Sequence, residues 1–173
     1  VARPHIVELT KQIGWPVSIA VRVGRDMMLR DSTHANSSLT FEHYYPGFTV
    51  PILDSASGKL SMAFAIDEDR EMILRFMRIS QKIDTDYLST AEIGLNVDQI
   101  RADGYAVQGR NHFNLTPGKT SSIAVPIFKD GHFEAAMTMV FFVAAMKLND
   151  ALENYLDNLK QAAAAISHEL SNH

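Results

Sequence analysis

The stretch from Thr120 to Val143 constrains the fold more strongly than any other part of the chain. Two apolar runs rich in β-forming residues flank the dipeptide Asp130-Gly131. An Asp-Gly pair in that position is the strongest short-range indication of a β-hairpin. Two loop lengths are possible, and they predict different strand pairings. A two-residue loop at Asp130-Gly131 would set Ser122 opposite Met139.

A three-residue loop from Lys129 to Gly131 would instead set Ser122 opposite Thr138 and Ala124 opposite Ala136. We expect this longer loop, because it places Gly131 where a positive φ is needed for the bulge that accompanies such loops. The pairing of Ser122 with Thr138 is therefore the predicted register of the hairpin.

The two faces of the hairpin differ in kind, because side chains alternate between faces along a strand. One face is large and apolar, and suits a core: Ile123, Val125, Met137, Met139 and Phe141. The other face is small and has two hydroxyl groups: Ser122, Ala124, Ala136, Thr138 and Val140. Small side chains on a central sheet leave room above it for a ligand. Alternatively, they only accommodate a closely packed helix.

Composition narrows the class of protein. The chain has 173 residues, of which 46% are hydrophobic, enough for one domain with a substantial core. A net charge of −4 without a basic run argues against nucleic-acid binding by this chain alone. The absence of cysteine excludes disulfides, thiol nucleophiles and thiolate metal sites, and is compatible with the cytoplasm. The longest apolar stretch, residues 135–146, is too short to span a bilayer.

Hydrophobic periodicity and turn residues predict the other elements. We expect helices over residues 4–13, 60–65, 67–79, 90–102 and 147–170. We expect strands over residues 17–23, 26–30, 39–45 and 105–107, an extended segment over 48–53, and polar loops over 31–38 and 108–119. There is no internal repeat or low-complexity linker, so the chain is predicted to be a single α+β domain.

Two of these helices have a clear apolar stripe. On the helix over residues 67–79 the stripe is predicted to contain Met72, Ile73, Phe76 and Ile79. On the last helix it contains Leu148, Leu152, Tyr155, Leu156, Leu159, Ala163, Ile166 and Leu170. We expect the last stripe to pack on the apolar face of the hairpin or to join subunits.

The segment from Asp54 to Lys59 precedes a helix and ends in Ser57-Gly58-Lys59. A helix that starts here directs backbone N–H groups and the positive end of its dipole at whatever lies above it, as an anion site requires. Most helix starts hold only water or their own capping side chain, so this alternative stays open.

Other motifs give no sign of catalysis. Gly118-Lys119-Thr120 resembles the end of a phosphate-binding loop, but that motif requires a glycine where Phe113 stands. Seven histidines are present, without the helical spacing of a metal site. There is no Gly-x-Ser-x-Gly sequence. We therefore expect neither an enzyme nor a cofactor or metal.

Three segments together resemble a known family: Leu53 to Lys59 (LDSASGK), Ile100 to Ala106 (IRADGYA) and Ser121 to Phe128 (SSIAVPIF). In this order and spacing they are similar to the effector-binding domain of IclR-family bacterial transcription regulators. The resemblance implies a GAF- or PAS-like curved antiparallel sheet flanked by helices. It also implies that a winged helix-turn-helix domain precedes residues 1–173 in the whole protein, which fits a chain that begins at Val1 inside a helical pattern.

The resemblance implies a site for a small carboxylic acid. Its carboxylate would meet the backbone around Ala56, Ser57 and Gly58, and polar sheet positions that fall on Ser122 and Thr138. The family's second serine on that strand is Val140 here, and an acidic position of keto-acid-binding members falls near His112, with Arg110 close by. These departures favour a larger, partly aromatic acid. The predicted set is completed by Leu39, Phe41, Met62 and Phe113.

Two further segments resemble the subgroup that activates hydroxyphenylpropionate catabolism: Leu29 to His34 and Val140 to Met146. The resulting expectation is a cytoplasmic sensor domain in a homodimer or homotetramer, which meets DNA only through the preceding domain and does not meet a membrane. A module that only dimerises, with a pocket filled by its own side chains, is the alternative. A hydrolase or isomerase on a GAF-like scaffold is disfavoured, because no nucleophile and base can be paired.

Overall fold

The computed structural model describes residues 1–37, 44–80, 95–109 and 118–172. Its centre is a curved six-stranded sheet with the order β3-β2-β1-β6-β5-β4, in which every neighbouring pair is antiparallel. The strands are β1 Val17–Val23, β2 Asp26–Ser32, β3 Thr49–Pro51, β4 Ala106–Gln108, β5 Thr120–Lys129 and β6 His132–Phe142. The predicted α+β class, an antiparallel sheet flanked by helices in one domain, is confirmed.

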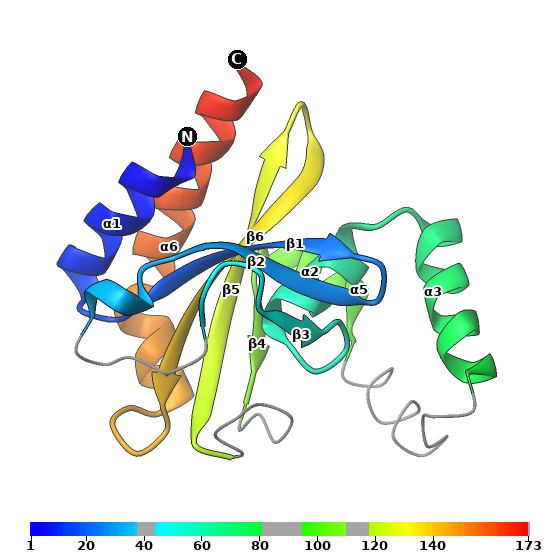
Figure 1. The fold of residues 1–173 in the computed structure, drawn as a ribbon, viewed down its shortest axis with the longest axis horizontal. Helices are drawn as coiled ribbons and strands as arrows, with labels where there is room; N and C mark the ends of the chain where they lie inside the picture. Colours follow the sequence, from blue (N-terminus) through cyan, green and yellow to red (C-terminus); the bar gives the residue numbers. More distant parts are fainter. Residues whose placement is uncertain (38–43, 81–94, 110–117, 173) are drawn as a thin grey trace.

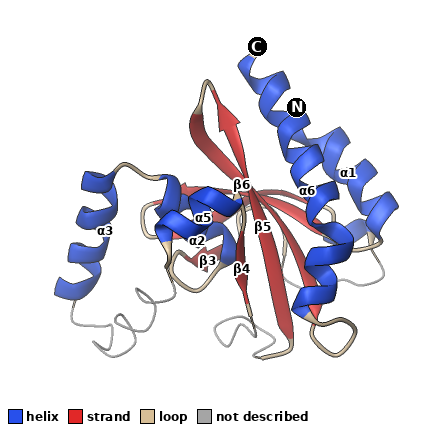
Figure 2. Ribbon diagram, turned by 180° about the vertical axis from the view of Figure 1, so that it is seen from behind, coloured by secondary structure: helices blue, strands red, loops and turns tan. Residues whose placement is uncertain are grey.

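Helices cover both faces of the sheet (Figures 1 and 2). On one face α1 (Ala2–Ile13) lies beside α6 (Leu148–Ser171), and on the other lie α2 (Ala56–Phe64) and α5 (Val97–Asp103). The helix α3 (Asp67–Ile79) stands at the side of the molecule, and a 3₁₀ turn, His34–Asn36, follows β2. Most predicted elements are thus present, with bounds shifted by a few residues.

Each face of the sheet has its own core. Toward α1 and α6 the sheet presents the large residues of the hairpin, all fully buried: Ile123, Val125, Met137, Met139 and Phe141. Toward α2 it presents small residues, also buried: Ala20, Ala124 and Ala136. The predicted division of the hairpin into a large face and a small face is confirmed.

The hairpin register is not the predicted one. Lys129 pairs with His132, so the loop has two residues, and Asp130 and Gly131 both have a positive φ (50° and 80°), as a type I′ turn requires. A β-bulge near the turn then shifts the register, so Ser122 lies opposite Val140. The three-residue loop is therefore wrong, because Asp130 itself tolerates the left-handed conformation.

The pairing expected for the two-residue loop is also wrong, because of the same bulge, which lies between Ile127 and Phe128. Ala124 consequently lies opposite Thr138. The true register differs from the predicted one by two residues on one strand, and side chains repeat every two residues. The composition of each face therefore survives the error.

The apolar stripe predicted for α3 is mostly wrong. Ile73 is buried as expected, but the other buried residues are Leu74 and Met77. The remaining members of the predicted stripe are well exposed to solvent: Met72 (62%), Phe76 (55%) and Ile79 (69%). The helix has apolar residues on two sides, and periodicity did not show which of them meets the core.

Smaller differences concern element ends. β2 continues to Ser32, beyond the strand predicted over 26–30. α5 begins at Val97, and the Asn96 side chain caps it by accepting a hydrogen bond from the Gln99 N–H (3.1 Å). The prediction that Leu95 and Asn96 are helical is therefore wrong. Of the strand expected over 39–45, only Tyr44 and Tyr45 are described, and they are not in a strand. Residues 90–94 of the predicted helix lie outside the described residues.

The stripe of α6 is confirmed in position but is buried only along its centre. Its fully buried residues are Leu159, Ala163 and Ile166, together with Ala151. Leu148, Leu152, Tyr155, Leu156 and Leu170 are partly buried against the same core. Of the two predicted roles, α6 thus fulfils the first, closing the core over the large face of the hairpin.

The start of α2 lies against the backbone of the segment before it. A Cβ added to Gly58 would lie 1.8 Å from the carbonyl oxygen of Ile52, which is backbone and cannot move aside easily. Gly58 is therefore needed for this close approach.

We predict that Gly58→Ala lowers the free energy of unfolding by at least about 2 kcal/mol, because the methyl group forces apart two backbone segments. Gly109→Ala is the matched control, since a Cβ at Gly109 has no neighbour within 4 Å. Urea denaturation of both variants measures the difference. Equal stabilities would show that α2 can shift at little cost.

Candidate ligand-binding site

The start of α2 supplies part of its own cap. The Ser55 hydroxyl accepts a hydrogen bond from the Gly58 N–H (3.1 Å) and donates one to the Pro51 carbonyl (2.9 Å). The Ser57 hydroxyl lies 3.4 Å from that of Ser55 and is buried. The N–H of Gly58, which was expected to meet a carboxylate, is thus already used by Ser55.

Three hydroxyl side chains stand in line across the sheet on the face toward α2. Ser32 on β2 lies opposite Ser18 on β1, and Ser18 lies opposite Thr138 on β6. The line continues to Ala124 on β5 and Ala106 on β4. Residues directly opposite each other share a face. All three hydroxyl-bearing residues are at least nine-tenths buried.

A second line lies next to the first. Val140 on β6 is opposite Ser122 on β5, which is opposite Gln108 on β4. The structure therefore brings the predicted residues Ser122, Thr138 and Val140 onto one face. Met62 of α2 is fully buried in the core on the same side of the sheet.

Two buried polar atoms on these lines lack a hydrogen-bond partner in the part of the chain that the structure describes: the Thr138 Oγ1 and the Gln108 Oε1. The Gln108 Nε2 donates to the Gly109 carbonyl (3.3 Å), which fixes which end of the amide is the free oxygen. A buried polar atom without a partner is uncommon and costly. The Thr138 Oγ1 and the Gln108 Oε1 are therefore candidate positions for a hydrogen bond to a ligand.

The alanines give a different result. Ala20, Ala124 and Ala136 pack in one cluster with Leu60 and Met62 of α2. For Ala124 and Ala136 of the hairpin the alternative interpretation is right, since their small size lets a helix come close. The polar positions lie toward the carboxyl-terminal half of β6, beyond Ala136.

Five predicted residues lie outside the described residues: Leu39, Phe41, Arg110, His112 and Phe113. Their place in the site stays a prediction.

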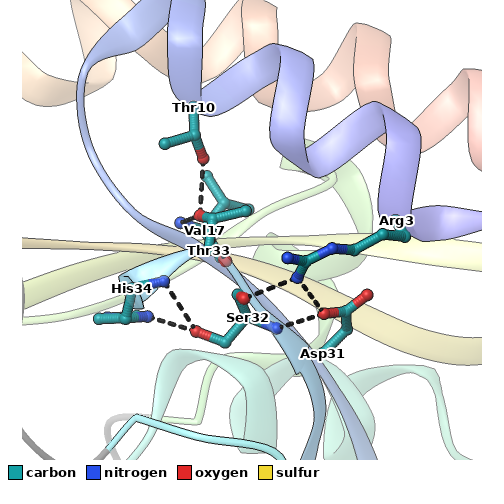
Figure 3. A network of polar contacts seen from close by, with 7 residues as sticks. All are labelled: Arg3, Thr10, Val17, Asp31, Ser32, Thr33 and His34. Atoms are coloured by element: carbon teal, nitrogen blue, oxygen red, sulfur yellow. Dashed lines mark hydrogen bonds and ion pairs between the residues drawn. The ribbon is translucent and has the colours of Figure 1, made fainter. Parts of the chain in front are cut away.

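His34 was missed by sequence reasoning. Its Nδ1 lies 2.6 Å from the Ser32 hydroxyl, which also accepts a hydrogen bond from the His34 backbone N–H (3.2 Å; Figure 3). The His34 ring stacks on Tyr44, with the ring centroids 4.8 Å apart. Burial lowers the pKa of His34 from 6.5 to about 4, so the imidazole is neutral at pH 7. The histidine next to a buried row of hydroxyls was not recognisable as part of a site without the fold.

The backbone of Ser32 connects this row to the opposite face of the sheet. Its carbonyl accepts a hydrogen bond from Arg3 of α1 (2.8 Å), and Arg3 also pairs with the Asp31 carboxylate (2.6 Å). Next along the chain, the Thr33 hydroxyl bonds to Thr10 of α1 (2.7 Å) and accepts the Val17 N–H (2.8 Å), as Figure 3 shows. The end of β2 is thus bound to α1.

Lys59 is a second residue that sequence reasoning missed. Its Nζ donates to the Val107 carbonyl of β4 (3.0 Å), so it reaches from the first turn of α2 to the sheet. Burial lowers the pKa of Lys59, and the nearby Asp54 partly opposes that shift. It is a partly buried cation beside the two polar lines.

Among the described residues, no group of three or more histidine, aspartate or glutamate side chains could hold a metal ion. No helix in the described ranges is long and apolar enough to cross a membrane.

Comparison with known proteins gives the family. The model of the family described as "Bacterial transcriptional regulator IclR C-terminal" matches residues 1–168. The chain belongs to this family. The HTH-type transcriptional regulator BhcR of Paracoccus denitrificans is 27% identical over 170 residues, which are 98% of this chain and 58% of that protein. The chain therefore spans little more than half the length of this curated relative.

Solved structures agree with the fold of this IclR domain. A transcriptional regulator from Rhodococcus sp. RHA1 superposes with a TM-score of 0.81 at 19% identity, over 99% of this chain and 68% of the other. The inducer-binding domain of PobR from Acinetobacter, solved as a double mutant with 3-hydroxybenzoic acid, has a TM-score of 0.75 at 15% identity, over 96% and 95%. The family consists of transcriptional regulators, and its C-terminal domains are not enzymes.

We predict that stability falls as the pH drops from 7 to 5, by about 2 kcal/mol from His34 alone. Folding lowers the pKa of His34, so the unfolded chain binds a proton that the folded chain excludes. This contribution is complete above pH 6.5 and is lost progressively as the pH falls toward 4. Urea denaturation at both pH values measures it, and His34→Gln should show a smaller pH dependence. An unchanged pH dependence in the variant would assign the effect to other groups.

Proposed function

We propose that this IclR-family domain senses a hydroxylated aromatic carboxylic acid, held between the sheet and α2, as part of a cytoplasmic transcription regulator. Binding of this effector would alter DNA binding by a domain that precedes residue 1. The observation that carries the proposal is the pair of buried atoms without partners, the Thr138 Oγ1 and the Gln108 Oε1. Each would gain a hydrogen bond from a ligand of this class.

The chemistry of the two atoms is different and limits the ligand. The Thr138 hydroxyl can donate a hydrogen bond to a carboxylate, whereas the Gln108 Oε1 can only accept one. A ligand that satisfies both has an acceptor and an O–H or N–H donor. A hydroxylated acid fits, and the resemblance to the hydroxyphenylpropionate subgroup and the hydroxybenzoic acid bound to PobR support this class.

A buried carboxylate also needs compensating charge, because an unpaired one is very costly. Lys59 supplies a partly buried cation beside the sheet. The start of α2 at Ala56 and Ser57 adds the positive end of the helix dipole. Arg110, from the sequence prediction, would be a third source.

The route by which the effector acts would run through β2. Ser18 and Thr138 stand in line with Ser32, and the Ser32 carbonyl holds Arg3 of α1 on the other face. A ligand that shifts Ser32 would shift the contacts of α1, the helix nearest to the preceding domain. The effector can move this equilibrium only by its difference in affinity between the two states.

The second candidate function is a module that only joins subunits. It is favoured by the alanines and Met62, which fill the space beneath α2 with the domain's own side chains. Under this alternative no acid would bind.

Thermal shift assays decide between the two. The probes are 3-hydroxyphenylpropionate and 3-hydroxybenzoate, with pyruvate as a small keto acid and 3-phenylpropanol as an uncharged control. A ligand at a hundred times its dissociation constant adds about 2.7 kcal/mol of stability, a shift that is easily measured. Stabilisation by the aromatic acids and not by the alcohol supports the proposal. Stabilisation by pyruvate alone, or by none of the probes, contradicts it.

We predict opposite effects of Thr138→Val on stability and on binding. Valine has the same shape and removes the hydroxyl without a partner, so the free domain should gain up to about 1–3 kcal/mol. Binding of 3-hydroxyphenylpropionate should weaken about tenfold or more, since a charge-assisted hydrogen bond is lost. Calorimetric titration and urea denaturation measure the two quantities. Thr49→Val, on the exposed strand β3, is the matched control and should change neither.

We predict that Arg110→Ala weakens binding of the same acid by about 1–3 kcal/mol with little change in stability. Arg22→Ala, at an exposed position of β1, is the control. Unchanged affinity in a calorimetric titration would remove Arg110 from the site and leave Lys59 and the start of α2 to compensate the carboxylate.

A further inference from the structure

The sheet divides at a defined point, and a cavity lies there. The pairing of β1 with β6 ends where Ala20 lies opposite Ala136. Beyond Ala20, β1 pairs only with β2, and the first residues of β6 pair only with β5, so the tip of the hairpin stands apart from β1 and β2 (Figures 1 and 2). A cavity of about 590 Å³ is lined by β1, β2, β6, α3 and the carboxyl-terminal half of α2, with Val21, Ser61 and Phe133 among its residues. Its volume is typical of small-molecule sites.

The β-bulge of the hairpin lies at the same point. Ile127 pairs with Ala135 and Phe128 with Phe133, so Glu134 is the extra residue and has no partner on β5. A bulge bends its strand and redirects the side chains next to it. The bend falls where β6 leaves β1, so it contributes to the opening of the sheet.

Charges of both signs line this cavity. If the register of β1 and β6 continued for two more residues, Arg22 would lie opposite Glu134, and both side chains line the cavity. Arg30 of β2 and Asp69 of α3 line it as well. None of these four side chains forms an ion pair or a hydrogen bond with another residue in the part of the chain that the structure describes. The cavity thus offers two guanidinium groups and two carboxylates to a bound molecule.

The cavity also presents a hydroxyl group and an apolar surface. Ser61 of α2 is only 4% exposed, and its hydroxyl forms no hydrogen bond with another described residue. A buried polar side chain usually has a partner, so this hydroxyl is available to a molecule in the cavity. Phe64 of α2 and Phe133 of β6 also line the cavity, and their rings are parallel, with centroids 6.1 Å apart. Such a pair is a surface on which another ring can pack.

We propose that this cavity is a second small-molecule site, and that its ligand is an aromatic amino acid. The carboxylate of the ligand pairs with the guanidinium groups of β1 and β2. Its ammonium group pairs with Glu134 and Asp69, and its ring packs against Phe64 and Phe133. An acid alone would be repelled by the two carboxylates, and an amine alone by the two guanidinium groups. A zwitterion meets a charge of opposite sign at both of its ends.

This site is separate from the site proposed for the aromatic acid. That site lies at the start of α2, near Thr138 and Gln108, and none of its described residues lines the present cavity. Loss of acid binding would leave the amino-acid site to be measured, and loss of amino-acid binding would leave the acid site to be measured. The two proposals can therefore fail separately.

Calorimetric titration of the domain with L-phenylalanine tests the second site. We expect one binding event, which persists when 3-hydroxyphenylpropionate is present in excess. Phenethylamine, which lacks the carboxylate, and L-alanine, which lacks the ring, should bind at least about tenfold more weakly. The absence of L-phenylalanine binding at millimolar concentration, strict competition with the aromatic acid, or equally strong binding of phenethylamine would overturn the proposal.

Paired variants test the residues of the cavity. Arg22→Gln and Glu134→Gln should each weaken binding of L-phenylalanine about threefold or more, as expected for exposed charge contacts. Arg75→Gln on α3 and Glu153→Gln on α6 are the matched controls, because both positions are exposed and lie outside the cavity. Ser61→Ala should also weaken binding, without lowering the free energy of unfolding measured in urea. Equal affinities of the cavity variants and the controls would contradict the assignment.

Discussion

The close contact of α2 with the sheet is the constraint on which the rest of the structure depends. Gly58 allows the start of the helix to rest on the backbone at Ile52, and three alanines allow its apolar side to approach the strands. An ordinary side chain at any of these positions would lift α2 away. Because α2 is fixed in this way, Lys59 in its first turn reaches the Val107 carbonyl.

The same contact determines which part of the small face remains polar. Over Ala20 and Ala136 the helix excludes water and any ligand. Beyond them the sheet changes to Thr138, Ser122 and Gln108, where the described residues leave two polar atoms without partners. Leaving such atoms unpaired destabilises the free domain, so a ligand that pairs with them regains this energy on binding. In the proposed function, part of the stability of the free domain is given up at these two atoms and recovered when the effector binds.

Much of this arrangement could be predicted from the sequence. The division of the hairpin into two faces follows from strict alternation, and it survived a wrong register because the error was an even number of residues. The bulge itself was not predicted from the sequence. The helix α3 has apolar residues on two sides, so hydrophobic periodicity could not predict which side is buried. Its tertiary contacts determine which side is buried.

Candidate residues whose position depends on strand pairing were the hardest to predict from the sequence. In the sequence, nothing distinguishes Ser18 and Ser32 from other strand residues. Only the strand register shows that they lie in line with Thr138. His34 is distinguished by its burial and by its hydrogen bond to Ser32, and both depend on the turn that follows β2. Local sequence cannot predict such lines, because they are formed by pairing between strands that are far apart in the chain.

The line through Ser32 would also allow the proposed site to influence a helix on the other face of the sheet. Alternate residues of β2 point to opposite faces, so Asp31 meets Arg3 of α1 while the Ser32 side chain stands on the face toward α2. The Ser32 carbonyl and N–H bond to Arg3 and Asp31. A small change in the backbone torsion angles of Ser32 would therefore alter contacts on both faces at once. Since His34 is neutral at pH 7, no change of charge is needed for that movement, and hydrogen bonding alone would couple the two faces.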